Sequence, residues 1–233
     1  MNPYNPYAPR ANVQASTDSN AFMQKVYAYM AGGLAATAAT ATVVASSETF
    51  AEVIHGNPIV FYGLMIAEVG LVIAFSTLVN RLSTAAAAAL FFGYSILNGL
   101  TLSVIFMAYT ASSIGSTFFV TAGTFGAVSL YGYATKRDLS GLGSFAMMGL
   151  FGLIIASLVN LFLKSPMIYW LTTFVGVIVF TGLAAYDTQK LKRFAATAGA
   201  GQESRVALQG ALMLYLDFIN LFLYMLRILG RRR

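Results

Sequence analysis

The sequence predicts an all-α fold: a polytopic membrane bundle of seven transmembrane helices. Of the 233 residues, 58% are hydrophobic and only 9% are charged, whereas soluble domains carry roughly 25% charged residues because their surface faces water. The hydrophobic residues gather in seven runs, each close to the ~20 residues that cross a ~30 Å hydrocarbon core. These runs are long, rich in Leu, Ala and Gly, and lack the two-residue alternation of a membrane β-barrel.

The seven helices are predicted over residues 25–46, 58–80, 85–109, 114–134, 143–163, 167–189 and 206–229. Together they form a transmembrane domain over residues 25–230, followed by a basic end at 231–233. Residues 1–24 are rich in Pro, Asn, Tyr and Ser, which predicts a disordered N-terminal tail. Pro58 and Pro166 stand at helix starts, where a missing N–H costs little. The first helix consists mostly of small residues, which favour close helix packing and a structural role.

The distribution of lysine and arginine predicts a cytoplasmic N-terminus. In that orientation the following basic residues fall inside: Arg10, Lys25, Arg81, Lys136, Arg137, Lys190, Lys192, Arg193 and Arg205. Lys164 falls outside, together with Glu48 and Glu52. The arginines at 231–233 would lie outside if the last run spans, so a re-entrant last segment is an alternative. Spanning is favoured because residues 211–229 contain no Gly or Pro to break the helix.

The net charge of +6 resides mainly in short connections between apolar runs. Membrane lipids with anionic headgroups are therefore the expected partners of the basic side chains, and nucleic acid is not. The absence of cysteine excludes disulfides and thiolate metal sites. The single histidine, His55, lies in a polar stretch and is interpreted as a solvated loop residue. We expect no cofactor and no bound metal.

Three acidic residues lie within the apolar runs, where each costs roughly 2.5–3.5 kcal/mol on insertion scales. Glu68 is near the middle of the second run, and either fixes packing through hydrogen bonds or lines a conduit. Asp187 is at the cytoplasmic end of the sixth run, where it can reach water. Asp217 lies midway along the seventh run, which is apolar on all faces, so this helix is expected to be surrounded by protein.

Two carboxyl groups brought together cannot both ionise cheaply, so Asp187 and Asp217 would form one proton-sensitive unit if their helices meet. The basic residues that follow Asp187 oppose this effect. Three asparagines, Asn98, Asn160 and Asn220, also lie within the runs and are interpreted as interhelical hydrogen-bonding residues.

Around the two aspartates the chain resembles the bacterial branch of the Bax inhibitor-1 family, the transmembrane Bax-inhibitor-motif proteins. The matching segments are Tyr-Asp-Thr-Gln at 186–189 and Leu-Tyr-Leu-Asp-Phe-Ile-Asn-Leu-Phe at 214–222. Asn-Gly-Leu-Thr-Leu-Ser at 98–103 and Lys-Arg-Asp-Leu at 136–139 are also similar to the family. The resemblance covers everything except the N-terminal tail.

This resemblance implies a bacterial inner-membrane protein in which six helices wrap a central C-terminal helix. It also implies a pH-dependent leak of calcium ions, gated near the cytoplasmic face by two aspartates that share a proton. Those aspartates correspond to Asp187 and Asp217. Arg81 is the candidate for the arginine that latches the first of them in the family's closed state, and Glu68 is a candidate conduit residue.

Other classes of function are weighed against the channel. An enzyme is not expected, because intramembrane aspartyl proteases carry Gly-x-Gly-Asp where this chain has Leu-Tyr-Leu before Asp217. With His55 alone, neither a rhomboid-like serine site nor an HExxH metal site can form. The main alternative is a non-enzymatic regulator that binds other membrane proteins, such as a quality-control protease, through its N-terminal tail. A proton-coupled transporter would show inverted repeats, and none is visible.

Overall fold

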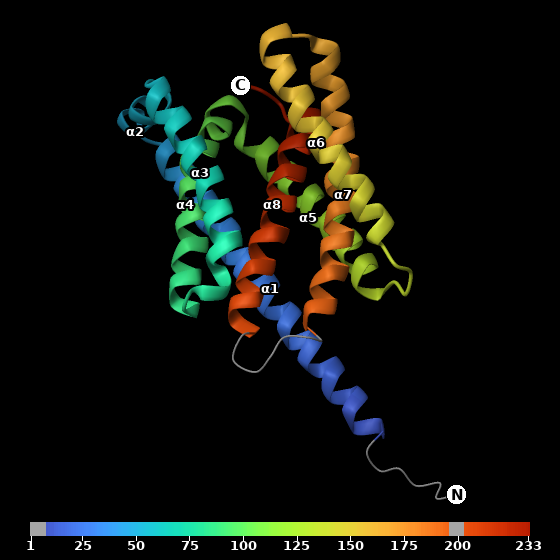
Figure 1. The fold of residues 1–233 in the computed structure, drawn as a ribbon. Helices are drawn as coiled ribbons and strands as arrows, with labels where there is room; N and C mark the ends of the chain where they lie inside the picture. The colour runs from blue at the N-terminus through green and yellow to red at the C-terminus, as the bar shows by residue number, and fades with distance from the viewer. Residues whose placement is uncertain (1–7, 196–202) are drawn as a thin grey trace, which may run out of the picture.

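The computed structural model describes residues 8–195 and 203–233, which form helices joined by short connections (Figure 1). The elements in chain order are α1 (Ala8–Ala45), α2 (Glu48–His55), α3 (Pro58–Leu78), the 3-10 turn η1 (Val79–Arg81), α4 (Thr84–Ala108), α5 (Ala111–Ala134), α6 (Ser140–Leu163), α7 (Pro166–Ala195) and α8 (Glu203–Leu229). All of these helices except α2 and η1 contain a stretch long and apolar enough to cross a membrane. The predicted all-α bundle of seven spans is therefore confirmed.

Local sequence signals account for several helix ends. The side chain of Asn57 accepts a hydrogen bond from the backbone N–H of Ile59 at 3.0 Å, and Pro58 follows at the first helical position of α3. Ser83 caps α4 in the same way. Helix α6 ends at Lys164, whose φ of 47° is the left-handed conformation that terminates a helix. These capping residues fix where the helices begin and end, and therefore how short the connections between neighbouring spans are.

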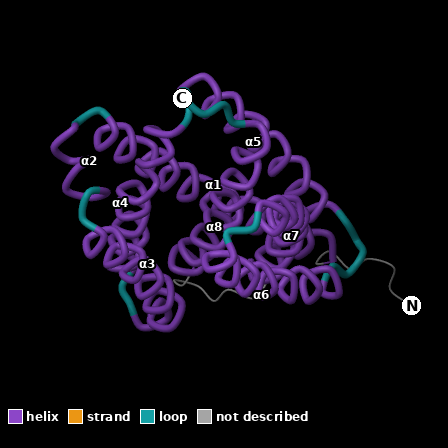
Figure 2. Tube along the Cα trace, turned by 90° about the horizontal axis from the view of Figure 1, so that it is seen from above, coloured by secondary structure: helices purple, strands orange, loops and turns teal. Residues whose placement is uncertain are grey.

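Helix α8 lies in the middle of the bundle (Figures 1 and 2). Half of its most apolar stretch is buried, compared with 6% for α3 and 11% for α6. Helices α1, α4, α5 and α7 pack directly against α8, while α3 lies outside α4 and α6 lies outside α7. The predicted central position of the last helix is thus confirmed, with α3 and α6 as an outer layer.

Small residues allow the closest approaches between helices. A Cβ atom added to Gly132 of α5 would lie 2.1 Å from the carbonyl oxygen of Ala185 in α7. A Cβ atom added to Gly99 of α4 would lie 2.7 Å from the carbonyl oxygen of Thr37 in α1. Both glycines are therefore required where they stand, because membrane helices gain packing energy by bringing their backbones together. The first of these crossings lies only two residues before Asp187.

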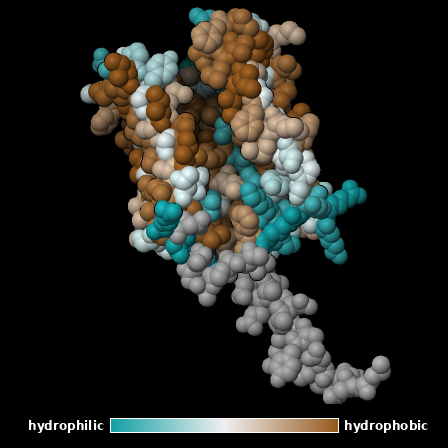
Figure 3. All heavy atoms as spheres, viewed as in Figure 1, coloured by the Kyte–Doolittle hydropathy of each residue, from teal (hydrophilic) through white to brown (hydrophobic). Residues whose placement is uncertain are grey.

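The outer surface separates into apolar sides and one basic end. Helices α3 and α6 expose many large apolar side chains, which suits contact with lipid tails. On the face drawn in Figure 3, hydrophilic side chains gather at the lower end of the molecule. We call this the basic end, because the α5–α6 connection and the last turns of α7 bring together Lys136, Arg137, Lys190, Lys192 and Arg193 there.

The two ends of α8 lie at opposite ends of the bundle. In Figure 1, α8 starts at the basic end and runs to the end where α2 and the C-terminus lie. There the C-terminal backbone is held by the α4–α5 connection: the N–H of Thr110 donates to Arg231 at 3.0 Å, and the N–H of Arg233 donates to Ala108 at 3.0 Å. Helix α8 has no break, as the spanning alternative predicted.

Two parts of the chain differ from the sequence-based prediction. Helix α1 starts at Ala8 and not at residue 25, so the disordered tail predicted for residues 1–24 is wrong for 8–24. Phe22 and Met23 are buried, so the apolar stripe of α1 starts earlier than the long apolar run. The connection before α3 contains the short helix α2, whose Ala51 and Ile54 are buried. Residues 1–7 lie outside the described residues.

The chain has no cysteine, so its topology can be tested with single cysteines. We expect a cysteine at Thr135 to react with an impermeant maleimide only after the inner face is exposed. Cysteines at Lys164 and after Arg233 should react in intact cells, because both positions lie at the opposite end of the bundle. A C-terminal cysteine that behaves like Thr135→Cys would contradict a spanning α8.

Candidate functional site

The two aspartates lie at the same level on neighbouring helices. Helix α7 continues past Asp187 to Ala195, so this residue is inside the helix and not at its end. Asp187 is 9% exposed and Asp217 is 5% exposed. The prediction that Asp187 simply reaches water is therefore wrong, because two further turns of α7 and the neighbouring helix α8 cover it.

The carboxyl groups of Asp187 and Asp217 interact with each other as hydrogen-bond partners. An ionised carboxylate has no donor, so such a contact requires a proton on one of the two groups. The Oδ2 atom of Asp217 is buried and has no partner in the part of the chain that the structure describes. The two carboxyl groups therefore meet, as a shared proton requires. That the pair senses pH stays a prediction.

Few charged groups face the pair. Lys190, one turn after Asp187 on α7, is close enough to act on its charge. Its ammonium group also lies 5.9 Å from the ring centre of Tyr186 and 5.8 Å from that of Phe194. Arg81 is exposed in η1, and neither ion pair among the described residues involves it. The latch by Arg81 stays a prediction.

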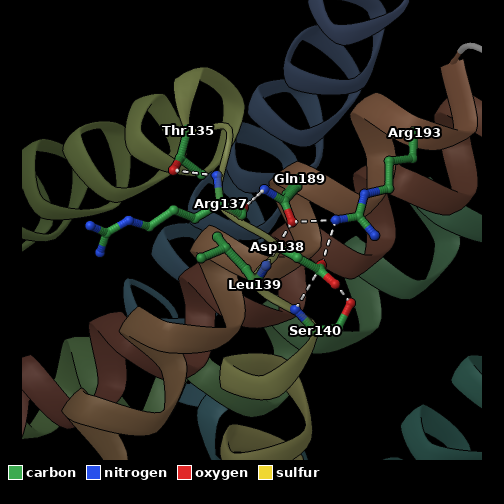
Figure 4. A network of polar contacts seen from close by, with 7 residues as sticks. All are labelled: Thr135, Arg137, Asp138, Leu139, Ser140, Gln189 and Arg193. Carbon is green, nitrogen blue, oxygen red and sulfur yellow. Dashed lines mark hydrogen bonds and ion pairs between the residues drawn. The ribbon is translucent and has the colours of Figure 1, made fainter.

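Gln189 fastens the end of α7 to the α5–α6 connection (Figure 4). Its Oε1 atom accepts a hydrogen bond from the N–H of Leu139 at 3.0 Å, and its Nε2 atom donates to the carbonyl oxygen of Arg137 at 2.8 Å. One side chain thus satisfies a donor and an acceptor of the same turn. Because Gln189 follows Asp187 by two residues, this contact fixes the end of α7 close to the carboxyl pair.

An ion pair supports the same contact. The guanidinium of Arg193 donates to Asp138 at 2.6 Å and to Gln189 at 2.7 Å. Asp138 also accepts hydrogen bonds from the backbone and side chain of Ser140 at 3.1 and 2.8 Å. The hydrogen bond from Arg193 is the main cause that lowers the pKa of Asp138 to about 2, and the bonds from Ser140 lower it further. Asp138 therefore stays ionised at physiological pH.

A second polar cluster extends from Glu68 on the outer helix α3 to the central helix α8. Glu68 of α3 accepts hydrogen bonds from Thr101 at 2.5 Å and from the amide of Asn98 at 3.3 Å, both on α4. The hydroxyl of Tyr215 on α8 donates to the Oδ1 atom of Asn98 at 3.0 Å, and lies 2.6 Å from the hydroxyl of Thr37 on α1. The cluster therefore joins four helices through side chains alone.

Tyr215 and Asp217 direct the polar contacts of α8 to two different sides. Residues two positions apart on a helix differ by about 200° in direction. Tyr215 accordingly faces α1 and α4, while Asp217 faces α7. The sequence alone revealed no role for Tyr215 or Gln189. The signal available for Tyr215 was a hydroxyl in the middle of an apolar run, which needs a hydrogen-bond partner when buried.

The predictions for the three asparagines have different outcomes. Asn98 makes the predicted interhelical hydrogen bonds. Asn160 and Asn220 do not follow the prediction: Asn160 accepts from the backbone of Ser165 at the end of its own helix, and Asn220 donates to the carbonyl of Leu216 one turn earlier. A short amide side chain can bond its own backbone as readily as a neighbouring helix, which periodicity does not distinguish.

His55 is not a solvated loop residue. It ends helix α2, is half-buried, and its Nε2 atom lies 2.8 Å from the hydroxyl of Ser103 on α4. Its ring centre is 5.5 Å from that of Phe61. Burial lowers the pKa of His55 below its usual value near 6.5. The fold of α2 onto α4, which the sequence did not reveal, accounts for the difference.

The described residues contain no group of three or more His, Cys, Asp or Glu side chains that could hold a metal ion. The three acidic side chains within the apolar runs instead form the pair of Asp187 and Asp217 and the single carboxyl of Glu68 in the hydrogen-bonded cluster.

Comparison with known proteins places the whole bundle in one group. Residues 19–233 match the family described as "Inhibitor of apoptosis-promoting Bax1". The chain is 50% identical over 228 residues to the inner membrane protein YbhL of Escherichia coli strain K12, which covers 97% of this chain and 95% of YbhL. It is 46% identical to an uncharacterized protein of Borreliella burgdorferi, over 92% of this chain and 93% of that protein. None of these descriptions is that of an enzyme.

The substitution Tyr215→Phe tests the cluster around Glu68. It removes one hydroxyl, so Asn98 and Thr37 each lose one hydrogen-bond partner, and we expect the free energy of unfolding to fall by about 1–2 kcal/mol. Unfolding of the purified protein in detergent measures this change. Tyr131→Phe is the matched control, because Tyr131 is exposed on the outside of α5. Equal stability of the two variants would show that the cluster does not stabilise the bundle.

Proposed function

We propose that this chain, which belongs to the Bax inhibitor-1 family, is a pH-sensitive, calcium-permeable leak channel of the bacterial inner membrane. Its gate is the pair of Asp187 and Asp217. The observation that carries this proposal is the contact between two buried carboxyl groups on adjoining helices, one of them on the central helix. The ion that passes through the channel is calcium. The location in the inner membrane is supported by YbhL, which is 50% identical and is described as an inner membrane protein.

The position of the pair suits a gate. Asp217 belongs to α8, which contacts four other membrane helices, so a small shift of α8 changes several interfaces together. Asp187 belongs to the part of α7 that Gln189 and Arg193 fasten to the α5–α6 connection. Asp187 thus lies near an end of α7 that is held in place, and Asp217 lies on the central helix α8.

The direction of the pH effect follows from the charge of the pair. With one shared proton the pair carries a negative charge, which attracts Lys190 and, in the latch that the resemblance implies, Arg81. Acidification adds a proton and removes this charge. The attraction then ends, the closed arrangement is weakened, and the leak increases.

Glu68 is the candidate conduit residue. It is half-buried between α3 and α4, and its oxygens are already held by Thr101 and Asn98. Carboxylate oxygens are preferred ligands of calcium ions, so a passing ion can exchange with these two hydrogen bonds.

A regulator that binds other membrane proteins is the second candidate, and the shape of α1 favours it. Figure 1 shows the start of α1 projecting beyond the other helices at the basic end. Deletion of residues 1–18 tests it, because it keeps Ser19, Phe22 and Met23, which are buried in the bundle. The deletion should spare ion flux and abolish a tail-mediated interaction.

Asp187→Asn and Asp217→Asn test the gate in liposomes that contain only this protein. For the parent chain we expect calcium flux to rise roughly five- to tenfold between about pH 8 and about pH 6. Asp187→Asn should keep flux high and nearly constant over that range, because position 187 no longer carries a titrating charge. Asp217→Asn should also remove the pH dependence.

Glu48→Gln is the control for these measurements, because Glu48 is exposed at the opposite end of the bundle. Its curve of flux against pH should match that of the parent. Parent-like curves from both aspartate variants would contradict the proposed gate. Equal flux with and without protein would contradict the channel.

Glu68→Gln tests the conduit, because the amide keeps the shape of the side chain and one of its acceptors. We expect flux of calcium to fall several-fold relative to flux of potassium, since the site loses its negative charge. The ratio of the two fluxes is measured in the same liposome preparation. An unchanged ratio would assign Glu68 to packing alone.

A further inference from the structure

A groove separates α1 from α5 at the basic end. Its volume is about 430 Å³, and it is lined in part by Met23 and Tyr27 of α1 and by Gly126, Ser129 and Leu130 of α5. Helices α1 and α5 are not closely packed against each other. Leu130 is 70% exposed, so the groove is open toward the lipid side of the bundle.

The wall of the groove contains a buried hydroxyl group without a partner. Ser129 is 3% exposed, and its Oγ atom has no hydrogen-bond partner among the described residues. An unsatisfied buried hydroxyl is costly, and is explained when a molecule outside the chain supplies the missing oxygen or donor. Tyr133 lies one turn after Ser129, also lines the groove and donates a hydrogen bond to Asn20 of α1 across it.

A basic pocket adjoins the groove at Tyr133. The ammonium of Lys192 on α7 lies 4.5 Å from the ring centre of Tyr133 and donates to its carbonyl oxygen at 2.7 Å. Lys192 also lines a pocket of about 340 Å³ with Lys136 and Arg137. The single acid in this pocket, Asp138, is neutralised by its ion pair with Arg193.

From these features we infer that the α1–α5 groove and the pocket beside it bind an anionic phospholipid. The phosphate lies at Lys192, with Lys136 and Arg137 adding positive charge, because basic pockets at the cytoplasmic side of a membrane attract anionic headgroups. The ester oxygens next to the phosphate accept a hydrogen bond from Ser129. One acyl chain lies along Gly126 and Leu130 against Met23. The ligand is a lipid, because three features follow one another from the basic end: the positive charge of Lys192, the buried hydroxyl of Ser129 and the apolar wall at Gly126 and Leu130. This order matches the phosphate, the ester groups and the acyl chain of a phospholipid.

Native mass spectrometry of the purified protein in detergent tests the headgroup site. We expect phosphatidylglycerol to bind more tightly than phosphatidylcholine of the same acyl chains. Lys192→Gln should weaken binding of phosphatidylglycerol about fivefold, the value of one lysine near a phosphate. Binding of phosphatidylcholine should weaken less, because its choline cation offsets the charge of its phosphate. Lys192→Arg should restore the preference, which a purely structural role in holding Tyr133 would not. Lys164→Gln, which removes the same charge at the opposite end, is the control.

Two further variants test the groove separately from the charge. Ser129→Ala should weaken both lipids equally. Gly126→Leu should block both, because a Cβ atom at Gly126 meets no other atom within 4 Å and a longer side chain projects into free space. Gly123→Leu is its control, since Gly123 is equally open but does not line the groove.

Three results would overturn the lipid site. One is equal affinity for the two lipids in the parent chain. Another is parent-like binding by both Lys192→Gln and Gly126→Leu. The third is displacement of phosphatidylglycerol by soluble glycerol 3-phosphate at equal concentration, which would assign the pocket to a free phosphate ester.

Discussion

A carboxyl group in the middle of an apolar helix constrains the whole bundle. Asp217 cannot face lipid without a large cost, so α8 must be enclosed by other helices and must offer Asp217 a polar partner. The structure meets both conditions: α1, α4, α5 and α7 pack around α8, and Asp187 of α7 supplies the partner. The central position of the last helix thus has an electrostatic cause as well as a packing cause.

Helix α8 also joins two polar systems that are otherwise separate. Through Tyr215 it reaches Asn98 and, beyond it, Glu68 in the outer helix α3. Through Asp217 it reaches Asp187, close to the contact of Gln189 with the α5–α6 connection. A rotation of α8 would disturb both systems at once, because their side chains leave the helix in different directions. In the proposed gate, this geometry couples protonation at one side of α8 to a rearrangement at the other.

The residues whose contacts were not predicted from the sequence share one property: each bonds a partner that is far away in the chain. Gln189 bonds the turn at Arg137 and Leu139, and His55 bonds Ser103. Asn160 and Asn220 show the reverse error, because their amides bond nearby backbone and not another helix. Whether a polar side chain turns inward, outward or back to its own helix is decided by space and competing partners, which hydrophobic periodicity does not contain.

The sequence by itself determined the seven spans, the enclosure of the last helix by other helices, and the presence of Asp187 and Asp217 in the last two spans. Hydrophobic length and the cost of charge in lipid act on each segment separately, so these features can be read without knowing which helices touch. Only the tertiary structure decided that Asp187 and Asp217 meet, that Glu68 is held by Thr101 and Asn98, and that α1 leaves a groove beside α5. Those contacts depend on helix rotation and crossing, which small residues such as Gly132 permit but do not specify without their neighbours.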